Sequence, residues 1–518
     1  MVISFLPRRH RGTEVTQRKR CHTVLIKSNP DETQSYLSDA SYMRDGHADA
    51  VVLPESLQDV SEILSSANRD GTPVTISGAG TGTVGGRVAF GGIVLATDKL
   101  NRIKNVDAEG YAIAEAGVVL SDFQQAVERE GMLYPPDPTE RGCFLGGTVS
   151  TNASGARTFK YGPTRNYIQR LKMVLANGEV LELRRGELKA EGDRLRIPLR
   201  SGSVIEARLP SYQRPNTRKN ATGYFVAPDM DVLDLFIGSE GTLAVVIEIE
   251  TRLLAKPQGL LSGVVFFESE SDVLSFVADV RSQSLENRQR SKVLGLDARA
   301  LEFFDSKSLD FLRQNYPNVP DSAVAAIFFE QETTSDSEDS LMNEWMTALD
   351  KHRAMAESWF ATNEQDQMKL REFRHQLPVL MNEWFARYEQ RKVSTDMAVP
   401  DEAFPGMFQL YQQTLRESGL RYTIFGHIGD NHVHVNILPR NDAEGVQARE
   451  LYVKFLQHAA SVGGTLSAEH GVGKLKREYL KLFYSEQQLR EMALLKRAFD
   501  PNGILGRGNI FSTDLLSG

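Results

Sequence analysis

Cysteine is scarce in this chain of 518 residues, which contains only two. Cys21 and Cys143 lie in unrelated contexts, so the sequence offers neither a disulfide framework nor a C-x-x-C metal knuckle. Because an iron–sulfur cluster is held by several clustered cysteine thiolates, a redox centre of that class within the chain is excluded. This cysteine usage fits reducing, intracellular conditions best, and we expect a cytoplasmic protein.

Long apolar runs are also lacking, since no stretch approaches the roughly 18 apolar residues that a membrane span needs. Positive charge is not in excess either: the formal net charge is −8, which argues against nucleic acid or an anionic membrane as a standing partner. The first 25 residues are an arginine-rich exception. No apolar segment follows them, so a secretory signal is not expected, whereas organelle import and peripheral membrane attachment stay open.

Glycine, by contrast, is plentiful and clustered. The loop at residues 76–92 (ISGAGTGTVGGRVAFGG) lies between apolar strands predicted over 73–76 and 93–97. Its glycines allow sharp turns with consecutive exposed N–H groups, which suit an anionic ligand such as a nucleotide diphosphate. A nicotinamide-binding Rossmann unit is excluded, because Thr83 replaces the third glycine of G-x-G-x-x-G and residues 87–92 are too few for a crossover helix. Taken alone, the loop also fits a glycine-rich surface hairpin.

Further motifs decide between these alternatives. A second cluster of small residues lies between 134 and 178, and KNATGY (219–224) and FIGSEGTLAVV (236–246) follow. Together they resemble the FAD domain of the vanillyl-alcohol oxidase superfamily, within it the D-lactate dehydrogenase, glycolate oxidase and D-2-hydroxyglutarate dehydrogenase group. The resemblance implies FAD, held non-covalently because the first loop has neither His nor Cys. It assigns cofactor contacts to Ser77, Gly78, Ala79, Gly80, Thr81, Gly82, Gly86, Pro136, Asp137, Gly146, Gly147, Ser150, Asn152, Gly155, Tyr161, Gly162, Gly241, Thr242 and Val246.

The resemblance also implies the architecture. We expect an α+β fold in which a two-subdomain FAD-binding domain of the vanillyl-alcohol oxidase type is joined to an α/β cap domain, the substrate domain, with an antiparallel sheet. The predicted divisions are an N-terminal extension at 1–45, the FAD-binding domain at 46–257, the cap domain with a metal site at 258–484, and a C-terminal segment that returns to the FAD domain at 485–518.

Local signals predict individual elements. Ser56 and Gly71 are typical of the start and end of a helix. Asn177-Gly178 predicts a hairpin turn. Residues 184–214 are charged and poorly periodic, and we expect an insertion or surface loop there. Strands are predicted over 293–297 and 393–400.

Five of the ten histidines fall between residues 427 and 470. The segment GHIGDNHVHVN alternates His432 and His434 on one expected strand face, with His427 before the turn, and Glu469-His470 lies in a glycine-flanked loop downstream. Two histidines and a carboxylate form a three-ligand site that leaves room for substrate. Taken alone, a His-x-His strand is also a common structural feature.

In the resembled group, the metal ligands correspond to His427, His434 and Glu469, and the general base to His470. This implies a divalent ion, zinc or manganese. The group usually has H-x-G-D-G-N-x-H, whereas Asn431 and His432 occupy the Gly-Asn positions here. For His432 three roles stay open: joining the metal, hydrogen bonding to the flavin, or lining the pocket.

An anionic substrate needs a cation, and Arg374 matches the helix position from which relatives send an arginine to the substrate carboxylate. An exposed helical arginine is the alternative. Relatives that handle a second carboxylate add a Thr and a Lys where this chain has Pro378 and Ser394. The resemblance therefore implies a dehydrogenase that oxidises a D-2-hydroxy acid, most simply a D-lactate-like monocarboxylate, by hydride transfer to flavin N5.

Two other functions stay open at this point. Alkylglycerone-phosphate synthases share this FAD domain and use it without net redox change, and a flavoprotein subunit of an electron-transfer complex is the third interpretation. For the dehydrogenase we expect a separate electron acceptor, such as a quinone, a cytochrome or an electron-transfer flavoprotein. The oligomeric state, a homodimer included, is left open.

Overall fold

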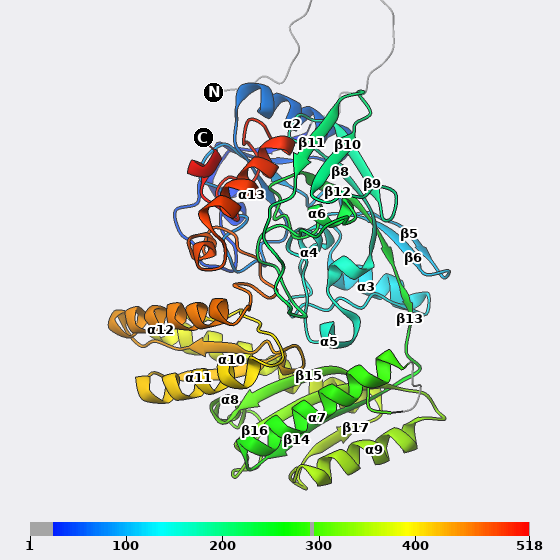
Figure 1. Ribbon diagram of the computed structural model, residues 1–518, viewed down its shortest axis with the longest axis vertical. Coiled ribbons are helices and arrows are strands. Elements are labelled where there is room, and N and C mark those ends of the chain that lie inside the picture. Colours follow the sequence, from blue (N-terminus) through cyan, green and yellow to red (C-terminus); the bar gives the residue numbers. More distant parts are fainter. Residues whose placement is uncertain (1–23, 291–294, 517–518) are drawn as a thin grey trace, which may run out of the picture.

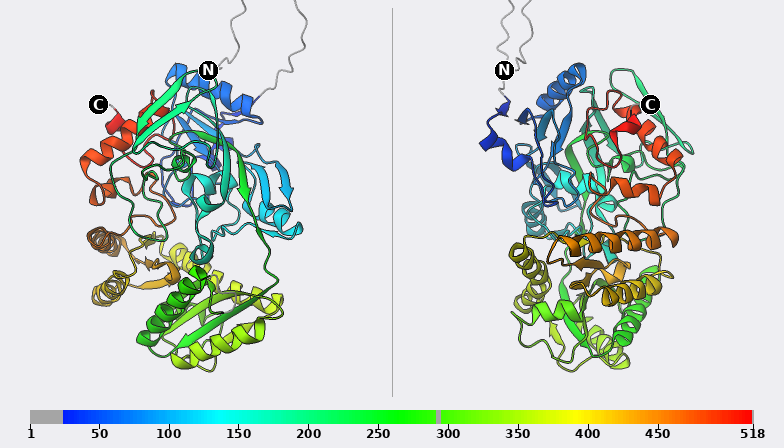
Figure 2. Two further views of the ribbon diagram at one scale, coloured as in Figure 1. Left: turned by 45° about the vertical axis from the view of Figure 1, so that its right-hand side comes forward. Right: turned by 90° about the vertical axis from the view of Figure 1, so that its left-hand side faces the viewer.

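A computed structural model describes residues 24–290 and 295–516. The chain forms two halves stacked along the long axis of the molecule (Figures 1 and 2). The upper half in Figure 1 contains the blue, cyan and teal N-terminal part together with the red C-terminal segment. The lower half contains a large antiparallel sheet with its helices. Loops of the two halves are in contact, since Ser154 and Lys219 of one half donate hydrogen bonds to Glu469 of the other.

The first sheet of the upper half has the strand order β1 (Leu25–Lys27), β2 (Ala50–Leu53), β4 (Ile93–Ala96), β3 (Val74–Ser77). Both β2 and β3 run parallel to β4. Helix α2 (Leu57–Asp70) connects β2 to β3; the Ser56 side chain accepts from Asp59 N at its start, and Gly71 ends it with a φ of 69°. The predicted helix signals are confirmed.

The second sheet is antiparallel. Its order is β5 (Ile103–Asp107), β6 (Tyr111–Glu115), β12 (Val245–Arg252), β8 (Ile168–Val174), β9 (Val180–Arg184). The hairpin turn predicted at residues 177–178 joins β8 to β9 and is confirmed. Remaining elements of this half are α1 (Pro30–Thr33), α3 (Leu120–Arg129), β7 (Met132–Leu133), α4 (Leu145–Thr151), α5 (Thr158–Tyr161), α6 (Leu233–Phe236) and β13 (Leu254–Ala255).

The prediction of a surface loop over 184–214 is wrong. Strands β10 (Arg194–Pro198) and β11 (Val204–Arg208) form an antiparallel hairpin there. Leu195 and Ile197 are buried and alternate with exposed charged residues, which is the period of a half-buried strand. The frequent charges hid this alternation because they occupy only its outward face.

The lower half contains seven antiparallel strands, in the order β17 (Trp359–Ala361), β14 (Gly259–Phe267), β16 (Ala325–Thr333), β15 (Ala298–Asp305), β19 (Tyr422–Gly426), β20 (His434–Ile437), β18 (Val393–Ser394). This confirms the antiparallel sheet expected for the cap domain. Its helices are α7 (Glu270–Gln289), α8 (Ser306–Leu312), α9 (Glu338–Lys351), α10 (Glu364–Tyr388), α11 (Phe404–Ser418) and α12 (Asp442–Ser461).

Two strand predictions in this half need correction. The strand expected over 293–297 lies partly outside the described residues, and the observed strand β15 begins at Ala298. The strand expected over 393–400 ends at Ser394. Beyond it the backbone pairs with another loop, since Ala468 N donates to Asp396 O at 2.7 Å and Thr465 N donates to Ala398 O at 2.9 Å. This pairing fixes Asp396 beside the Glu469-His470 loop.

The C-terminal segment lies against the first sheet. After α13 (Glu486–Phe499), Val74 N donates to Ile504 O at 2.8 Å and Gly506 N donates to Val74 O at 3.0 Å. The chain thereby runs from the upper half through the lower half and back (Figure 1).

Candidate active site

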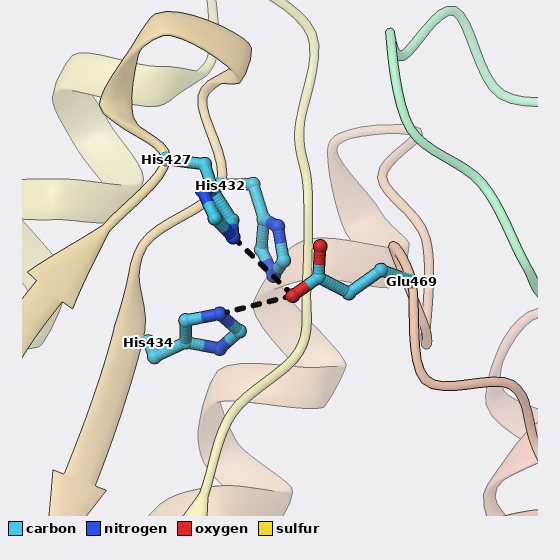
Figure 3. A group of neighbouring side chains, drawn as sticks. All are labelled: His427, His432, His434 and Glu469. Carbon is cyan, nitrogen blue, oxygen red and sulfur yellow. Dashed lines mark ion pairs between the residues drawn. The ribbon is translucent and has the colours of Figure 1, made fainter. Parts of the chain in front are cut away.

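Three histidines from one side of the site and Glu469 from the other meet at a single point (Figure 3). His427 follows β19, His434 opens β20, and Glu469 lies in the loop after α12. The Nε2 atoms of His427 and His434 lie 3.4 and 3.3 Å from Oε1 of Glu469. The structure therefore places Glu469 beside the two histidines that the resemblance assigns to the same metal site.

His432 belongs to the same group. One ligand atom from each of His427, His432, His434 and Glu469 lies within 4.8 Å of the others. His432 is fully buried, and its Nε2 lies 3.2 Å from Asp396 Oδ1. Burial lowers the pKa of His432 to about 3, so its imidazole is neutral and able to donate a lone pair.

These residues fit a divalent metal ion. Neutral imidazole nitrogens and a carboxylate are the donors that zinc and manganese accept. Neither ring nitrogen of the buried His432 makes a well-directed hydrogen bond within the described residues, so no donor from these residues occupies its lone pair. Burial opposes ionisation of Glu469, but Lys219 and His427 outweigh it and hold the pKa of that carboxyl well below its usual value. Glu469 is therefore an anionic ligand.

The other oxygen of Glu469 is held by the upper half. Lys219 Nζ lies 3.2 Å from Oε2, and Ser154 Oγ donates to the same oxygen at 3.2 Å. The Lys219 side chain is fully buried, donates to Gly155 O at 3.0 Å, and lies 3.5 Å from Asp430 Oδ2. These contacts leave Oε1 directed at the histidines.

Glu302, on β15, links His427 to Arg374 on α10. His427 Nδ1 lies 2.6 Å from Oε1 of Glu302, and Arg374 Nε donates to its Oε2 at 3.0 Å. Burial disfavours the imidazolium form of His427, but Glu302 and Glu469 outweigh burial and raise its pKa to about 9. Glu302 would keep the proton on Nδ1, so a divalent cation would bind at Nε2 by displacing the second proton. The Arg374 side chain is only 12% exposed, so the alternative of a solvent-facing helical arginine is wrong.

His470 is the most accessible imidazole of this site, with 34% of its side chain exposed. Nδ1 lies 3.3 Å from Asp396 Oδ2, and Nε2 lies 3.6 Å from Glu469 Oε1. Its ring stacks on that of His434 at a centroid distance of 5.5 Å. One nitrogen is therefore occupied by a buried carboxylate while the other faces the metal-ligand group.

Asp396 receives several further donors. The backbone N–H groups of Glu469 and His470 donate to it at 3.2 and 3.1 Å, and Lys476 Nζ and Ser467 Oγ donate at 2.6 and 2.5 Å. Burial opposes its ionisation, but His470 and Lys476 outweigh burial and hold the pKa of Asp396 well below its usual value. Asp396 is a fixed anion behind His470.

The residues predicted to hold FAD lie in loops of the upper half and on the adjoining elements β3, α4, α5 and β12. Space is open where a Cβ would stand on the partly buried Gly147 and on the exposed Gly82, which leaves room for a cofactor in an FAD cradle. The buried hydroxyl of Tyr161 has no hydrogen-bond partner within the described residues. Open backbone with an unsatisfied donor suits a large polar cofactor such as FAD.

Other predicted glycines have a packing role. A Cβ on Gly146 would come within 2.7 Å of Ala116 Cβ, and one on Gly155 would come within 2.0 Å of Asp137 O. Gly241 adopts a φ of 69° and lies against Ile76. Asp137 itself faces Arg141 and Arg157 at 2.8 and 3.3 Å. These positions shape the loops through close backbone approach.

Sequence reasoning missed Glu302, Asp396 and Lys219 as parts of the site. Glu302 lies in the fully buried strand β15, where no local signal marks it as part of a site. Asp396 stands in the segment STDMAVP and Lys219 in KNATGY. Both motifs could be identified in the sequence, but the residues that Asp396 and Lys219 contact could not. The contacts come from loops 71 and 250 residues away in sequence, which a local pattern does not reveal.

Together the fold and site define a cofactor-dependent enzyme: a glycine-lined cradle in one half lies beside a histidine and carboxylate cluster built largely by the other. Comparison with known proteins identifies the family. Residues 48–184 match the FAD binding domain and residues 259–510 match the C-terminal domain of FAD linked oxidases. The chain belongs to the FAD-linked oxidases and is an FAD-linked oxidoreductase.

Relatives of known name cover nearly the whole chain. It is 28% identical to glycolate oxidase subunit GlcD of Bacillus subtilis, covering 92% of both chains. It is 29% identical to D-lactate dehydrogenase of Anaerostipes hadrus (94% of both) and 28% identical to D-2-hydroxyglutarate dehydrogenase of Xanthomonas citri pv. viticola (95% of both).

Solved structures share the fold. p-Cresol methylhydroxylase with substrate bound matches with a TM-score of 0.67 at 16% identity, covering 94% of both chains. An alkyldihydroxyacetonephosphate synthase matches with a TM-score of 0.65 at 16% identity, covering 93% of this chain and 82% of that one. In the described part of the chain, no helix is long and apolar enough to cross a membrane.

Proposed function

We propose that this protein oxidises a D-2-hydroxy acid to the 2-oxo acid, with a D-lactate-like monocarboxylate as the expected substrate. The observation that supports this proposal best is the arrangement of His470. Its Nδ1 contacts Asp396, while its Nε2 faces the group formed by His427, His434 and Glu469. Relatives of similar length named for glycolate, D-lactate and D-2-hydroxyglutarate support the same class of substrate.

Arg374 would bind the substrate carboxylate. Its Nε donates to Glu302, which also contacts His427, and its Nη1 lies 2.9 Å from His375 Nε2. The remaining N–H donors would engage the carboxylate. A guanidinium that is almost buried and still charged is a strong site for a carboxylate, because little water competes for its N–H groups. The acid would thereby be held with its C2 hydroxyl toward His470.

His470 would remove the hydroxyl proton. Asp396 orients the imidazole, stabilises the imidazolium that forms, and is itself fixed by Lys476 and Ser467. His427, His434 and Glu469 would hold the divalent ion, zinc or manganese, which supplies a Lewis acid that lowers the pKa of a coordinated hydroxyl. Whether His432 joins them is left to metal analysis of its variants.

FAD, held by the loops of the upper half, would supply the acceptor for the hydride that leaves C2. Lys219, Ser154 and the Gly155 carbonyl tie these loops to Glu469, so the cofactor cradle and the proton-transfer site form one unit. Because the sequence contains no cysteine cluster, a separate acceptor would reoxidise the protein: a quinone, a cytochrome or an electron-transfer flavoprotein.

Steady-state assays with an artificial electron acceptor test this proposal. D-lactate, L-lactate, glycolate, D-malate and D-2-hydroxyglutarate are compared, and the 2-oxo acid is identified by its hydrazone. We expect turnover with at least one D-2-hydroxy acid and little with L-lactate. If no hydroxy acid turns over although FAD is bound, the proposed reaction is wrong, and carbon-adduct chemistry of the synthase type becomes the alternative to test.

A further inference from the structure

A basic hollow is lined by residues of the N-terminal region, the end of the first glycine-rich loop and the C-terminal segment. Its volume is about 880 Å³, within the size range of small-molecule sites. Within the described part of the chain, its lining shares no residue with the set expected to hold FAD. The lining residues are Met43, Arg44, Asp45, Phe90, Lys474, Arg477, Arg497, Pro501, Asn502, Gly503, Arg507, Gly508, Thr513 and Leu516.

Positive charge is concentrated here although the protein carries a net charge of −8. The lining contains four arginines and one lysine, against Asp45 as its acidic member. Lys474 Nζ is fixed by Asn509 Oδ1 at 2.7 Å, and burial lowers the pKa of Lys474 to about 8. An anion in the hollow would favour the charged ammonium and relieve this cost.

The arginines are held on structured backbone. Arg477 Nη1 donates to Gly508 O at 3.1 Å, and Arg507 Nε donates to Gly503 O at 2.8 Å. Arg477 Nε also lies 3.4 Å from Glu478 Oε1. Both guanidinium groups keep further N–H donors, because each has five. A planar fork of donors matches phosphate oxygens.

An aromatic ring completes the lining. Phe90 is 49% exposed, and His47 contacts its ring edge-on at a centroid distance of 6.1 Å. An exposed phenyl ring at the rim of a cationic hollow offers a stacking surface, while Met43 adds a polarisable apolar contact. Inorganic phosphate or a simple carboxylate would use the cations alone and leave this surface unused.

We propose that this hollow binds a nucleoside polyphosphate, with the phosphates on Arg44, Arg477 and Arg507, the charge of Lys474 beside them, and the base against Phe90. The site is separate from the FAD cradle. Lys474 also donates to the carbonyls of Gly85 and Gly86 at 3.4 and 3.3 Å, so the ligand would contact the outer side of the loop whose inner side is expected to hold the FAD diphosphate.

Isothermal titration of the FAD-loaded protein tests the proposal with ATP, ADP and tripolyphosphate at about 0.15 M salt, where weak surface attraction is screened. We expect one saturable site for ATP. Phe90→Ala should weaken ATP binding about tenfold but leave tripolyphosphate binding unchanged, because stacking of a base is worth roughly 1–3 kcal/mol. The double variant R44A/R507A should weaken both ligands about tenfold or more.

Arg353→Ala is the matched control, because Arg353 is 76% exposed, pairs with Asp272 and lies in the other half of the protein. It should bind ATP like the wild type. No saturable ATP binding, equal binding by wild type and R44A/R507A, or binding that occurs only after FAD removal would each overturn the proposal. The binding assay needs no hydroxy acid, so its result is independent of the proposed oxidation.

Discussion

Nδ1 of His470 lies 3.3 Å from Oδ2 of Asp396, and this contact leaves Nε2 facing Glu469 and the other proposed metal ligands. Asp396 is 1% exposed and is also bound by Lys476 and Ser467, so its carboxylate is fixed before any ligand arrives. A buried anion beside one ring nitrogen keeps the proton there and leaves the other nitrogen as the base.

Replacing Asp396 with Asn should lower kcat by about 10²-fold or more, because the amide does not stabilise the imidazolium. FAD content and metal content should stay at wild-type levels. Stopped-flow measurement of flavin reduction separates this effect from substrate binding. Asp310→Asn, at a half-exposed carboxylate in α8, is the control. Unchanged flavin reduction in D396N would contradict the orienting role.

The metal site predicts loss of turnover without loss of flavin. His427→Ala and Glu469→Ala should each reduce bound metal below about one-tenth of the wild-type content, because three-ligand sites tolerate few losses. Elemental analysis and the flavin spectrum provide the two readouts. His458→Ala, at a histidine of α12 outside the cluster, should retain metal and activity. Full activity in both ligand variants would exclude a catalytic metal.

Arg374 is predicted to bind the substrate carboxylate. Arg374→Met should reduce kcat/KM by roughly 10- to 100-fold, the value of a charge-assisted hydrogen bond. Arg374→Lys should restore little, because lysine lacks the planar fork that engages Glu302 and a carboxylate together. A KM equal to that of the wild type in both variants would assign the carboxylate to another cation.

Lys219 carries a stability prediction. Lys219→Met leaves Glu469 and Asp430 without their buried cation and should reduce the free energy of unfolding by about 3–5 kcal/mol. Lys256→Met removes an exposed pair with Glu128 and should cost at most about 1 kcal/mol. Urea midpoints of the two variants provide the measurement. Equal midpoints would mean that the contacts of Lys219 with Glu469 and Asp430 make no net contribution to the free energy of unfolding.

Glu240 predicts a dependence of stability on pH. Burial raises its pKa to about 7, although Val472 N and Gly473 N each donate to it at 2.7 Å. Between its ordinary value of 4.5 and about 7, the folded chain binds more protons at this group than the unfolded chain. The free energy of unfolding therefore falls as pH rises through this window, by roughly 3 kcal/mol in all.

Thermal midpoints across this pH range measure the effect. As pH rises, the thermal midpoint of the wild type should fall relative to that of Glu240→Gln, because glutamine does not titrate. A difference that stays constant from about pH 5 to pH 8 would show that Glu240 does not titrate in this window.

The overall architecture was predicted from the family resemblance, whereas local signals predicted individual elements. Ser56 and Gly71 mark helix ends by their own backbone chemistry, and Asn177-Gly178 marks a turn. The hairpin at 194–208 was missed because charges on its outward face masked the alternation of Leu195 and Ile197. The strand predicted over 393–400 was too long, because the backbone carbonyl of Asp396 accepts its hydrogen bond from a distant loop and not from a neighbouring strand.

The candidate site follows the same division. His427, His434, Glu469 and His470 stand in short motifs, and the structure places them together. Glu302 and Lys219 contribute through ion pairs between distant segments. The residues that flank them in the sequence do not predict which partner each will have. Burial of a charged side chain is a property of the fold, so local residue types do not reveal it.

The central claim is that a D-2-hydroxy acid is oxidised at the site of His470 and its neighbouring metal ligands. Anaerobic titration of the purified FAD-loaded protein with D- and L-lactate, glycolate, D-malate and D-2-hydroxyglutarate, before and after metal chelation, tests it most directly. The account predicts that a D-hydroxy acid bleaches the flavin, that chelation prevents this, and that added zinc or manganese restores it. A flavin that stays oxidised with every acid, or that bleaches equally after complete metal removal, would contradict it.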